Sequence, residues 1–499
     1  MDSAHLVLKS AKSFFAGTAL SRLSGFFRDI VMAVSFGSSP EIAAFMVSYR
    51  LANLFRRILG EGNLQAGFVP HFAALKGEEG HFFRDVAYSM AIVLIAVVAF
   101  LELVLWGLRG IVNEDWLTII DLTMWMVPGL FFISLYSLNS SLLQCRNKYF
   151  IPAAAPIAFN LIWILAVLIK PNVTFLSIAV TLAFAGQWFV TAFEGARLLP
   201  FKEWLKPRLF SADFQKLVKP LFLGLIGVGA VQFNSAMDTI FARIADLQGP
   251  TFLWFAIRLQ QLPMALFGIA LSGALLPPLS AAQDPVKKQE LLLSALKSAV
   301  ALMLVATFGI LAVGKEGVNL LYGHGDFTPT DVMKTTRCLW AYGLGLVPSI
   351  AVLIFSAKYY SEKNYQIPMI ASLLSVVINI GLNALFVFGF GLGAVSIALA
   401  TTLSSLLNAI LLAKGIHTYE FWSFFSKVAG SGLVATGVVL AAQFVWGEQI
   451  SRDLLQQVSH LTVFGGLFLG VLWGCMAFLG LNLFHLMGLR STEITRVLK

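Results

Sequence analysis

Residues 50–62 read RLANLFRRILGEG, and residues 21–29 read SRLSGFFRD. Both stretches carry arginines inside segments that are otherwise apolar. Helical spacing puts four polar residues of the first stretch on one face, namely Arg50, Asn53, Arg57 and Glu61. A charge at the centre of a bilayer costs at least about 2.5–3.5 kcal/mol, so such a face must turn to a watery cavity or to a partner.

The whole chain is more apolar than water-soluble domains are. Of its 499 residues, 58% are hydrophobic and 12% are charged, and its mean hydropathy is +0.81. Soluble domains have about 45–50% apolar and about 25% charged residues. A bilayer core takes about 20 apolar residues to cross, so we expect an all-α, polytopic membrane protein with about fourteen transmembrane helices. The expected helices cover residues 10–36, 41–60, 86–108, 117–144, 151–169, 174–196, 217–245, 251–280, 291–313, 331–357, 366–388, 391–413, 427–446 and 461–487. Pro128 and Pro348 are expected to interrupt two of them.

The distribution of positive charge predicts the orientation. Lysine and arginine concentrate in alternate loops, among them residues 197–209 and 283–290, and in the C-terminal tail. The positive-inside rule then places both termini in the cytoplasm. The net charge of +9 is explained by these loops, and we expect no nucleic-acid partner.

Two sequence matches predict an internal repeat. Arg50-Leu51 recurs as Arg258-Leu259, and the stretch at 147–152 recurs at 363–368. Parallel repeats of this kind are typical of transporters, which bind substrate between the two halves. We therefore expect two pseudo-symmetric six-helix lobes and two further helices. Their predicted bounds are 1–209, 210–415 and 416–499.

Arginines in an apolar setting with few acids nearby predict an anion site. The planar guanidinium binds phosphate oxygens in pairs, and several guanidiniums from different helices would suit a pyrophosphate. Arg22, Arg56 and Arg258 have no obvious carboxylate near them in the sequence. The alternative is structural: Arg28 would pair with Asp29, and Arg57 with Glu61.

A second polar set lies further along the chain. Asp238, Asn379 and Asn383 offer one carboxylate and two amide oxygens, and hard cations such as sodium take oxygen ligands. The alternative is a cluster of hydrogen bonds between helices, which polar residues commonly form in membranes.

Several motifs resemble the bacterial lipid II flippase family, MurJ or MviN. They are SRLSGFFRD, RLANLFRRILGEG, QAGFVP (65–70), SLLQCRNKYFIPAAAPIAFN (141–160), LLPPLS (275–280) and GHGDFTPTD (323–331). The resemblance implies the fourteen-helix fold of the MATE-like exporter superfamily. It places the family's cavity arginines on Arg22, Arg28, Arg56 and Arg258, and its sodium site on Asp238, Asn379 and Asn383. The chain departs from the family pattern at Ala43, Gln261 and Asn383, where many or some members have an acid.

The resemblance also implies a function. We expect a transporter, not an enzyme, that flips undecaprenyl-pyrophosphate-linked peptidoglycan precursor (lipid II) from the inner to the outer leaflet of the bacterial cytoplasmic membrane by alternating access. Arg22, Arg28, Arg56 and Arg258 would hold the head group, with Asn53, Arg57 and Glu61 beside them. We expect a monomer surrounded by membrane lipids, with other cell-wall synthesis proteins as partners and sodium as the one candidate cofactor.

Three alternatives stay open at this point. The first is a flippase for another polyprenyl-linked oligosaccharide, and the second is a cation-coupled drug exporter of the same superfamily. The third is a membrane-embedded transferase that would need Glu61 or Asp121 as its general base.

Overall fold

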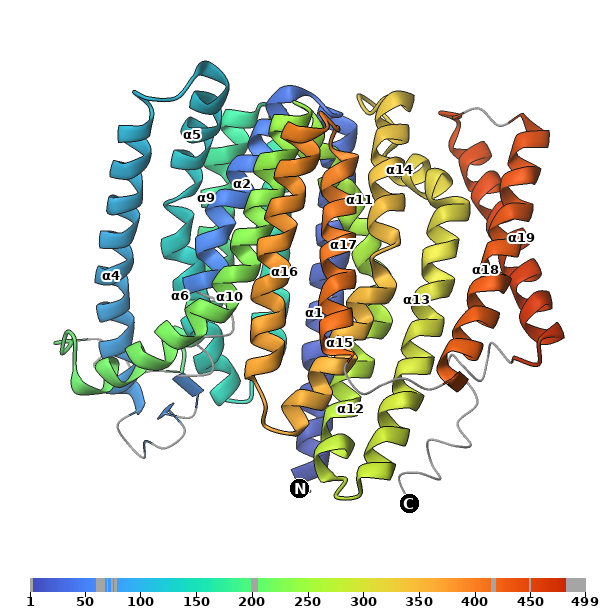
Figure 1. The fold of residues 1–499 in the computed structure, drawn as a ribbon. Coiled ribbons are helices and arrows are strands. Elements are labelled where there is room, and N and C mark those ends of the chain that lie inside the picture. The colour runs from blue at the N-terminus through green and yellow to red at the C-terminus, as the bar shows by residue number, and fades with distance from the viewer. Residues whose placement is uncertain are drawn as a thin grey trace. The chain divides into compact units, whose positions relative to one another are not determined.

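The computed structural model describes residues 3–59, 68–69, 71–72, 75, 79–198, 205–413, 419–447 and 450–481. The chain forms two compact units, residues 1–243 and residues 244–499, and each consists of helices packed side by side (Figure 1). The described ranges contain no strand. The prediction of an all-α fold is confirmed.

The first unit is built from long helices joined by short turns. Its elements are α1 (Ser3–Phe36), α2 (Pro40–Leu59), α4 (Glu79–Leu108), α5 (Glu114–Met126), α6 (Gly129–Cys145), α7 (Phe150–Ala154), α8 (Pro156–Ile169), α9 (Val173–Ala196) and most of α10 (Ala212–Ala245). Helix α1 packs against α7 and α8, α2 packs against α5, and α6 packs against α9. These pairings bring Arg28 on α1 next to side chains from α8.

The second unit is organised around one long helix, α13. Its elements are α11 (Gly249–Pro263), the π-helical turn η2 (Met264–Gly268), α12 (Ile269–Ala281), α13 (Pro285–Tyr322), α14 (Pro329–Gly343), α15 (Leu346–Ser361), α16 (Gln366–Ala384), the π-helical turn η3 (Leu385–Gly389), α17 (Val395–Leu412), α18 (Tyr419–Trp446) and α19 (Leu454–Phe478). Helix α13 packs against α14, α15, α18 and α19. Its buried side chains, such as Leu296, Met303 and Phe308, form much of the apolar core.

Two helix ends match at the spacing of the predicted repeat. Two residues after the ends of α6 and α15, Asn147 (φ 58°) and Lys363 (φ 59°) adopt the left-handed conformation. The following N–H groups of Lys148 and Asn364 then donate to carbonyls five residues back, at 2.8 and 2.9 Å. Both helix ends therefore carry the same cap, 216 residues apart.

The lobe bounds 1–209, 210–415 and 416–499 stay predictions. The two compact units meet within α10, between Arg243 and Ile244. One reason is that Arg243, near the end of α10, bonds to residues of α5 and α2. The second copy of the predicted repeat, in contrast, starts at residue 210, just before α10.

Every predicted helix overlaps a helix or a pair of helices, but some interruptions differ. Pro128 separates α5 and α6 as predicted, with a 40° bend. The break expected at Pro348 lies instead at Leu344 and Gly345. Pro348 is in the first turn of α15, where a proline is tolerated because its missing N–H has no helical acceptor.

The number of membrane crossings stays a prediction. Within the described ranges, nine helices are long and apolar enough to cross a membrane, or up to ten if the bent pair α5–α6 is one span. Helices α1 and α2 are outside this count, because arginines interrupt their apolar segments.

We predict that Gly432→Ala destabilises the second unit. A Cβ at Gly432 would lie 2.1 Å from Cδ2 of the buried Phe308 of α13, so the ring must move, and overpacking of this kind costs about 1–3 kcal/mol. The measurement is the midpoint of thermal unfolding in detergent. Gly437→Ala on the same helix is the control, because nothing lies within 4 Å of its Cβ. Equal midpoints for the two variants would contradict the packing described for α13 and α18.

Candidate functional site

Arg28 lies at the centre of a polar cluster between α1 and α8. Its side chain is buried, and its Nε and Nη2 donate to Asp29 Oδ1 at 3.1 and 2.7 Å. Its Nη1 donates to Asn160 Oδ1 on α8 at 3.1 Å. Three of the five guanidinium donors are thus used within the cluster.

The indole of Trp163 covers the face of this guanidinium. The Arg28 Cζ lies 4.7 Å from the ring centroid of Trp163, within the range of a cation–π interaction. Trp163 is fully buried, donates to Met32 Sδ at 3.0 Å and packs edge-on against Tyr49 of α2 at 5.0 Å. The cluster therefore joins α1, α2 and α8.

Arg22 differs from Arg28 in its surroundings. It lies on the same helix, but its side chain is exposed, and no ion pair joins it to an acid in the described ranges. Asn53 of α2 donates to the Tyr49 carbonyl at 2.8 Å. The side chains of Arg56, Arg57 and Glu61 lie outside the described residues, so their predicted roles stay predictions.

Arg258 belongs to the second unit and lies on α11. Its Cζ lies 4.6 Å from the ring centroid of Trp254, one turn earlier on the same helix. The convergence of Arg258 with the arginines of α1 and α2 stays a prediction. Arg28 and Arg258 share one feature that the sequence analysis missed, a tryptophan against the guanidinium.

The predicted sodium ligands are parts of two hydrogen-bonded groups. Asn383 Nδ2 donates to Asn379 Oδ1 at 3.1 Å, and Asn379 Nδ2 lies 3.4 Å from Ser404 Oγ of α17. Asp238 accepts from Asn234 of the same helix at 3.5 Å. The described ranges contain no group of three or more His, Cys, Asp or Glu side chains that could hold a metal. The two asparagines thus join α16 to α17, as the hydrogen-bond alternative expects, and the sodium assignment stays a prediction.

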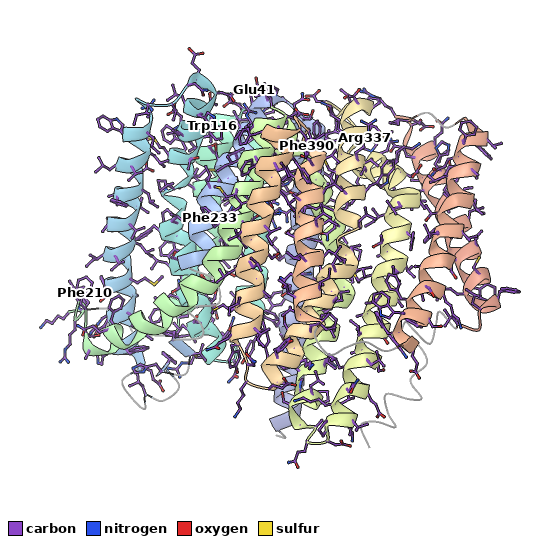
Figure 2. The ribbon with its side chains drawn as sticks, in the orientation of Figure 1. Glu41, Trp116, Phe210, Phe233, Arg337 and Phe390 are labelled. Atoms are coloured by element: carbon purple, nitrogen blue, oxygen red, sulfur yellow. The ribbon has the colours of Figure 1, made fainter. Side chains whose placement is uncertain are left out.

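Two further ion pairs were not anticipated. Arg243 Nη2 pairs with Asp115 at 2.7 Å, and its Nη1 donates to the Pro40 carbonyl at 2.8 Å, at the end of the unit where Glu41 and Trp116 are labelled in Figure 2. Arg84 pairs with Asp85 near the start of α4, close to Phe210. The first pair joins residues 128 positions apart, a contact that no local pattern indicates.

Asp121, a candidate base in the transferase alternative, is paired at the surface. Its Oδ1 lies 2.8 Å from Arg109 Nε, and the two side chains are 40% and 43% exposed. A general base must reach the proton that it removes, and the Asp121 carboxylate is already engaged by the Arg109 guanidinium at the surface. These contacts weigh against a catalytic Asp121.

Comparisons with known proteins agree on one family. The family model described as "Lipid II flippase MurJ" matches residues 32–464. A probable lipid II flippase MurJ of Chlamydia muridarum is 32% identical, over 90% of this chain and 86% of that protein. Another from Aquifex aeolicus is 29% identical, over 80% of this chain and 81% of that protein.

Solved structures show the same fold. A lipid II flippase MurJ in an inward closed conformation superposes with a TM-score of 0.77 and 23% identity, over 93% of this chain and 99% of the other. An inward-facing multidrug MATE transporter gives a TM-score of 0.61 and 15% identity, over 83% and 95%. At these identities the likeness concerns the fold alone. The prediction of a MATE-like fold is confirmed.

We predict that Arg243→Met destabilises the first unit more than Arg109→Met does. Arg243 has a side chain 4% exposed and bonds to two elements, so its loss should cost about 1–3 kcal/mol. Arg109 forms an exposed pair, which is worth about 0–1 kcal/mol. Thermal unfolding of both variants in the same detergent measures the difference, and a larger loss for Arg109→Met would refute the anchoring role of Arg243.

Proposed function

The chain belongs to the lipid II flippase MurJ family, and from this we propose that it moves lipid II from the inner to the outer leaflet of the bacterial cytoplasmic membrane. The observation that carries the proposal is the family match over residues 32–464. The apolar helices make it a multi-pass membrane protein. The basic loops support an orientation with both termini in the cytoplasm.

The physical task is to carry a charged head group past hydrocarbon. An unpaired ionised group transferred into an apolar medium costs many kcal/mol, so pyrophosphate must exchange water for cationic donors. We assign this role to Arg22 and Arg258, and to Arg56 by its place in the sequence. Their convergence on one head group is part of the proposal. Support comes from the exposed side chain of Arg22 on a helix within an apolar bundle.

This function requires no bond to be made or broken. The protein would bind the head group, change conformation by alternating access and release the lipid in the other leaflet. Differential affinity of the arginines for pyrophosphate in the two conformations is what such a cycle requires. We therefore propose a transporter without catalytic activity, and the surface pairing of Asp121 with Arg109 supports this over a transferase.

A sodium site at Asp238, Asn379 and Asn383 is a separate part of the proposal. The oxygen donors of these residues suit a hard cation, and one carboxylate balances one sodium charge. A bound sodium would supply positive charge that neutralises Asp238. The three residues lie on α10 and α16, and their meeting around one ion is proposed here on the chemistry of their donors.

We predict that Arg22→Ala and Arg258→Ala abolish growth in cells depleted of their own lipid II flippase, because each removes a cationic donor for pyrophosphate. Loss of one charged hydrogen bond, worth about 1.5–3 kcal/mol, reduces transport by roughly ten- to hundredfold. Complementation and immunoblotting of the membrane fraction are the measurements.

Two controls accompany this prediction. Arg109→Ala removes an exposed arginine paired with Asp121, and Asp121→Asn tests the transferase alternative. Both should support normal growth. Normal growth of Arg22→Ala and Arg258→Ala at wild-type protein levels would show that these arginines do not hold the head group.

We predict that transport in proteoliposomes depends on sodium and on Asp238. Replacing sodium by choline, or changing Asp238→Ala, should lower the rate of lipid II flipping by about tenfold, which corresponds to about 1.4 kcal/mol. Sodium should have no further effect on the Asp238→Ala protein. If wild-type rates are equal in both salts and Asp238→Ala is unchanged, the site does not exist.

A further inference from the structure

The tetrapeptide FFRD occurs twice in the chain, at residues 26–29 and 82–85. In both copies the arginine pairs with the aspartate that follows it. The distance from Arg28 Nη2 to Asp29 Oδ1 is 2.7 Å, and that from Arg84 Nη2 to Asp85 Oδ1 is 2.6 Å. Both arginines are 6% exposed. The same four residues thus build the same buried ion pair at two places.

The second copy shows what such a pair does. Arg84 Nη1 donates to the Leu205 carbonyl at 2.9 Å, and Asp85 Oδ1 accepts from the Arg208 N–H at 2.9 Å. Ser89, one turn further along α4, accepts from the Phe210 N–H at 2.9 Å. The pair therefore fastens the backbone of residues 205–210 to α4, and its role is that of a tether.

The first copy makes the corresponding contacts between two helices. Arg28 Nη1 donates to Asn160 Oδ1 at 3.1 Å, and Asn160 Nδ2 donates back to Ser24 Oγ of α1 at 2.8 Å. The indole of Trp163 covers one face of the guanidinium. Three donors and one face of Arg28 are thus engaged by α1 and α8, and Arg28 also interacts with Tyr49 of α2, in contrast to the exposed side chain of Arg22.

We infer that Arg28 is a tethered counter-cation and not a ligand of the lipid head group. It neutralises Asp29 inside the bundle and fixes α1 on α8. Arg22 lies six residues earlier on α1, which at about 100° per residue puts it about 120° away around the helix. Arg28 is therefore a positioning residue that sets the place of Arg22. This inference deepens the proposed function and rests on it for its transport measurement.

The repeat supplies an independent contrast. Helices α1 and α10 end at Phe36 and Ala245, and the same shift of 209 residues relates Asp29 to Asp238. Met237 therefore occupies the position before Asp238 that Arg28 occupies before Asp29. The shift of 216 residues, which relates the two helix caps, makes Asn379 the counterpart of Trp163. At the positions that these shifts relate, the second half thus keeps the aspartate and has neither the arginine nor the tryptophan, as expected if the indole serves to cover the guanidinium.

A double-substitution cycle on the full chain tests the inference. Arg28→Met removes the cation and leaves the buried Asp29 without it, and Arg28→Met with Asp29→Asn removes both charges. Breaking a buried pair destabilises strongly, whereas replacing both partners is often neutral. The single variant should lower the unfolding midpoint by about 5 °C and abolish complementation. The double variant should recover most of the midpoint and restore growth.

The second FFRD copy is the matched control. Arg84→Met and the pair Arg84→Met with Asp85→Asn should show the same loss and recovery of the unfolding midpoint, because the ion pair has the same geometry. If the Arg28→Met, Asp29→Asn protein is as stable as the wild type and still does not support growth, Arg28 contacts the substrate and the inference is overturned. The inference is also overturned if Arg28→Met leaves the unfolding midpoint unchanged.

A measurement on the wild-type protein decides the matter if the variants do not fold. An arginine-directed dicarbonyl reagent should modify Arg22 at least about ten times faster than Arg28, as measured by mass spectrometry. The reason is that the reagent can reach the exposed guanidinium of Arg22 but not the buried one of Arg28. Undecaprenyl pyrophosphate should protect Arg22 and leave the rate at Arg28 unchanged. Fast modification of Arg28 that the lipid suppresses would overturn the inference.

These readouts separate the inference from the proposed function. If the wild-type chain fails to complement flippase-depleted cells, the function is wrong, and the unfolding midpoints and the rate of Arg28 modification still decide whether Arg28 is a tether. If the wild type complements and Arg28 behaves as a ligand, the function stands and the tether does not.

Discussion

The cost of charge in hydrocarbon is the constraint on which this structure depends. An arginine in an apolar bundle must find an acid, a carbonyl or an aromatic face, or else line a watery space. Arg28, Arg84 and Arg243 satisfy the rule by pairing with Asp29, Asp85 and Asp115. Each of these pairs also ties separate elements together, so the same interaction that makes the charge tolerable determines how the helices pack. Arg22, on the same helix as Arg28, has an exposed side chain instead.

Most of the fold could be predicted from hydropathy, because apolar segments of helical length leave few alternatives in a membrane. The bend at Pro128 followed from the missing N–H of proline. The break at Gly345 did not, because it depends on close packing: a Cβ there would lie 2.8 Å from Thr402 Oγ1, a residue of another helix. The π-helical turns at 264–268 and 385–389 were also missed, since one extra residue in a helical turn leaves no signature in the periodicity of an apolar segment.

In the cluster around Arg28, the pairing with Asp29 could be predicted from the sequence, and the contacts with α8 could not. Arginines within apolar stretches were evident, and Asp29 was recognised as a neighbour that could neutralise Arg28. Asn160 and Trp163 were missed because they lie more than 130 residues away and carry no pattern that marks them as partners of α1. The repeated FFRD was the one local signal available, since two copies of a tetrapeptide with the same charge pair indicate a shared structural use.

The repeat gives the two halves one scaffold and different charges. In the first half the carboxylate of Asp29 is neutralised within the chain by Arg28, whose position is fixed by α8. In the second half the residue before Asp238 is Met237, and Asn234 of the same helix donates to the Asp238 carboxylate at 3.5 Å. A cation that belongs to the chain, such as Arg28, cannot leave the site that it neutralises. A ligand shifts a conformational equilibrium only through different affinities for the two states. Under the proposed function, an ion at Asp238 would regulate packing only if it bound the two conformations differently, whereas the Arg28–Asp29 pair needs no ion from outside to hold α1 on α8.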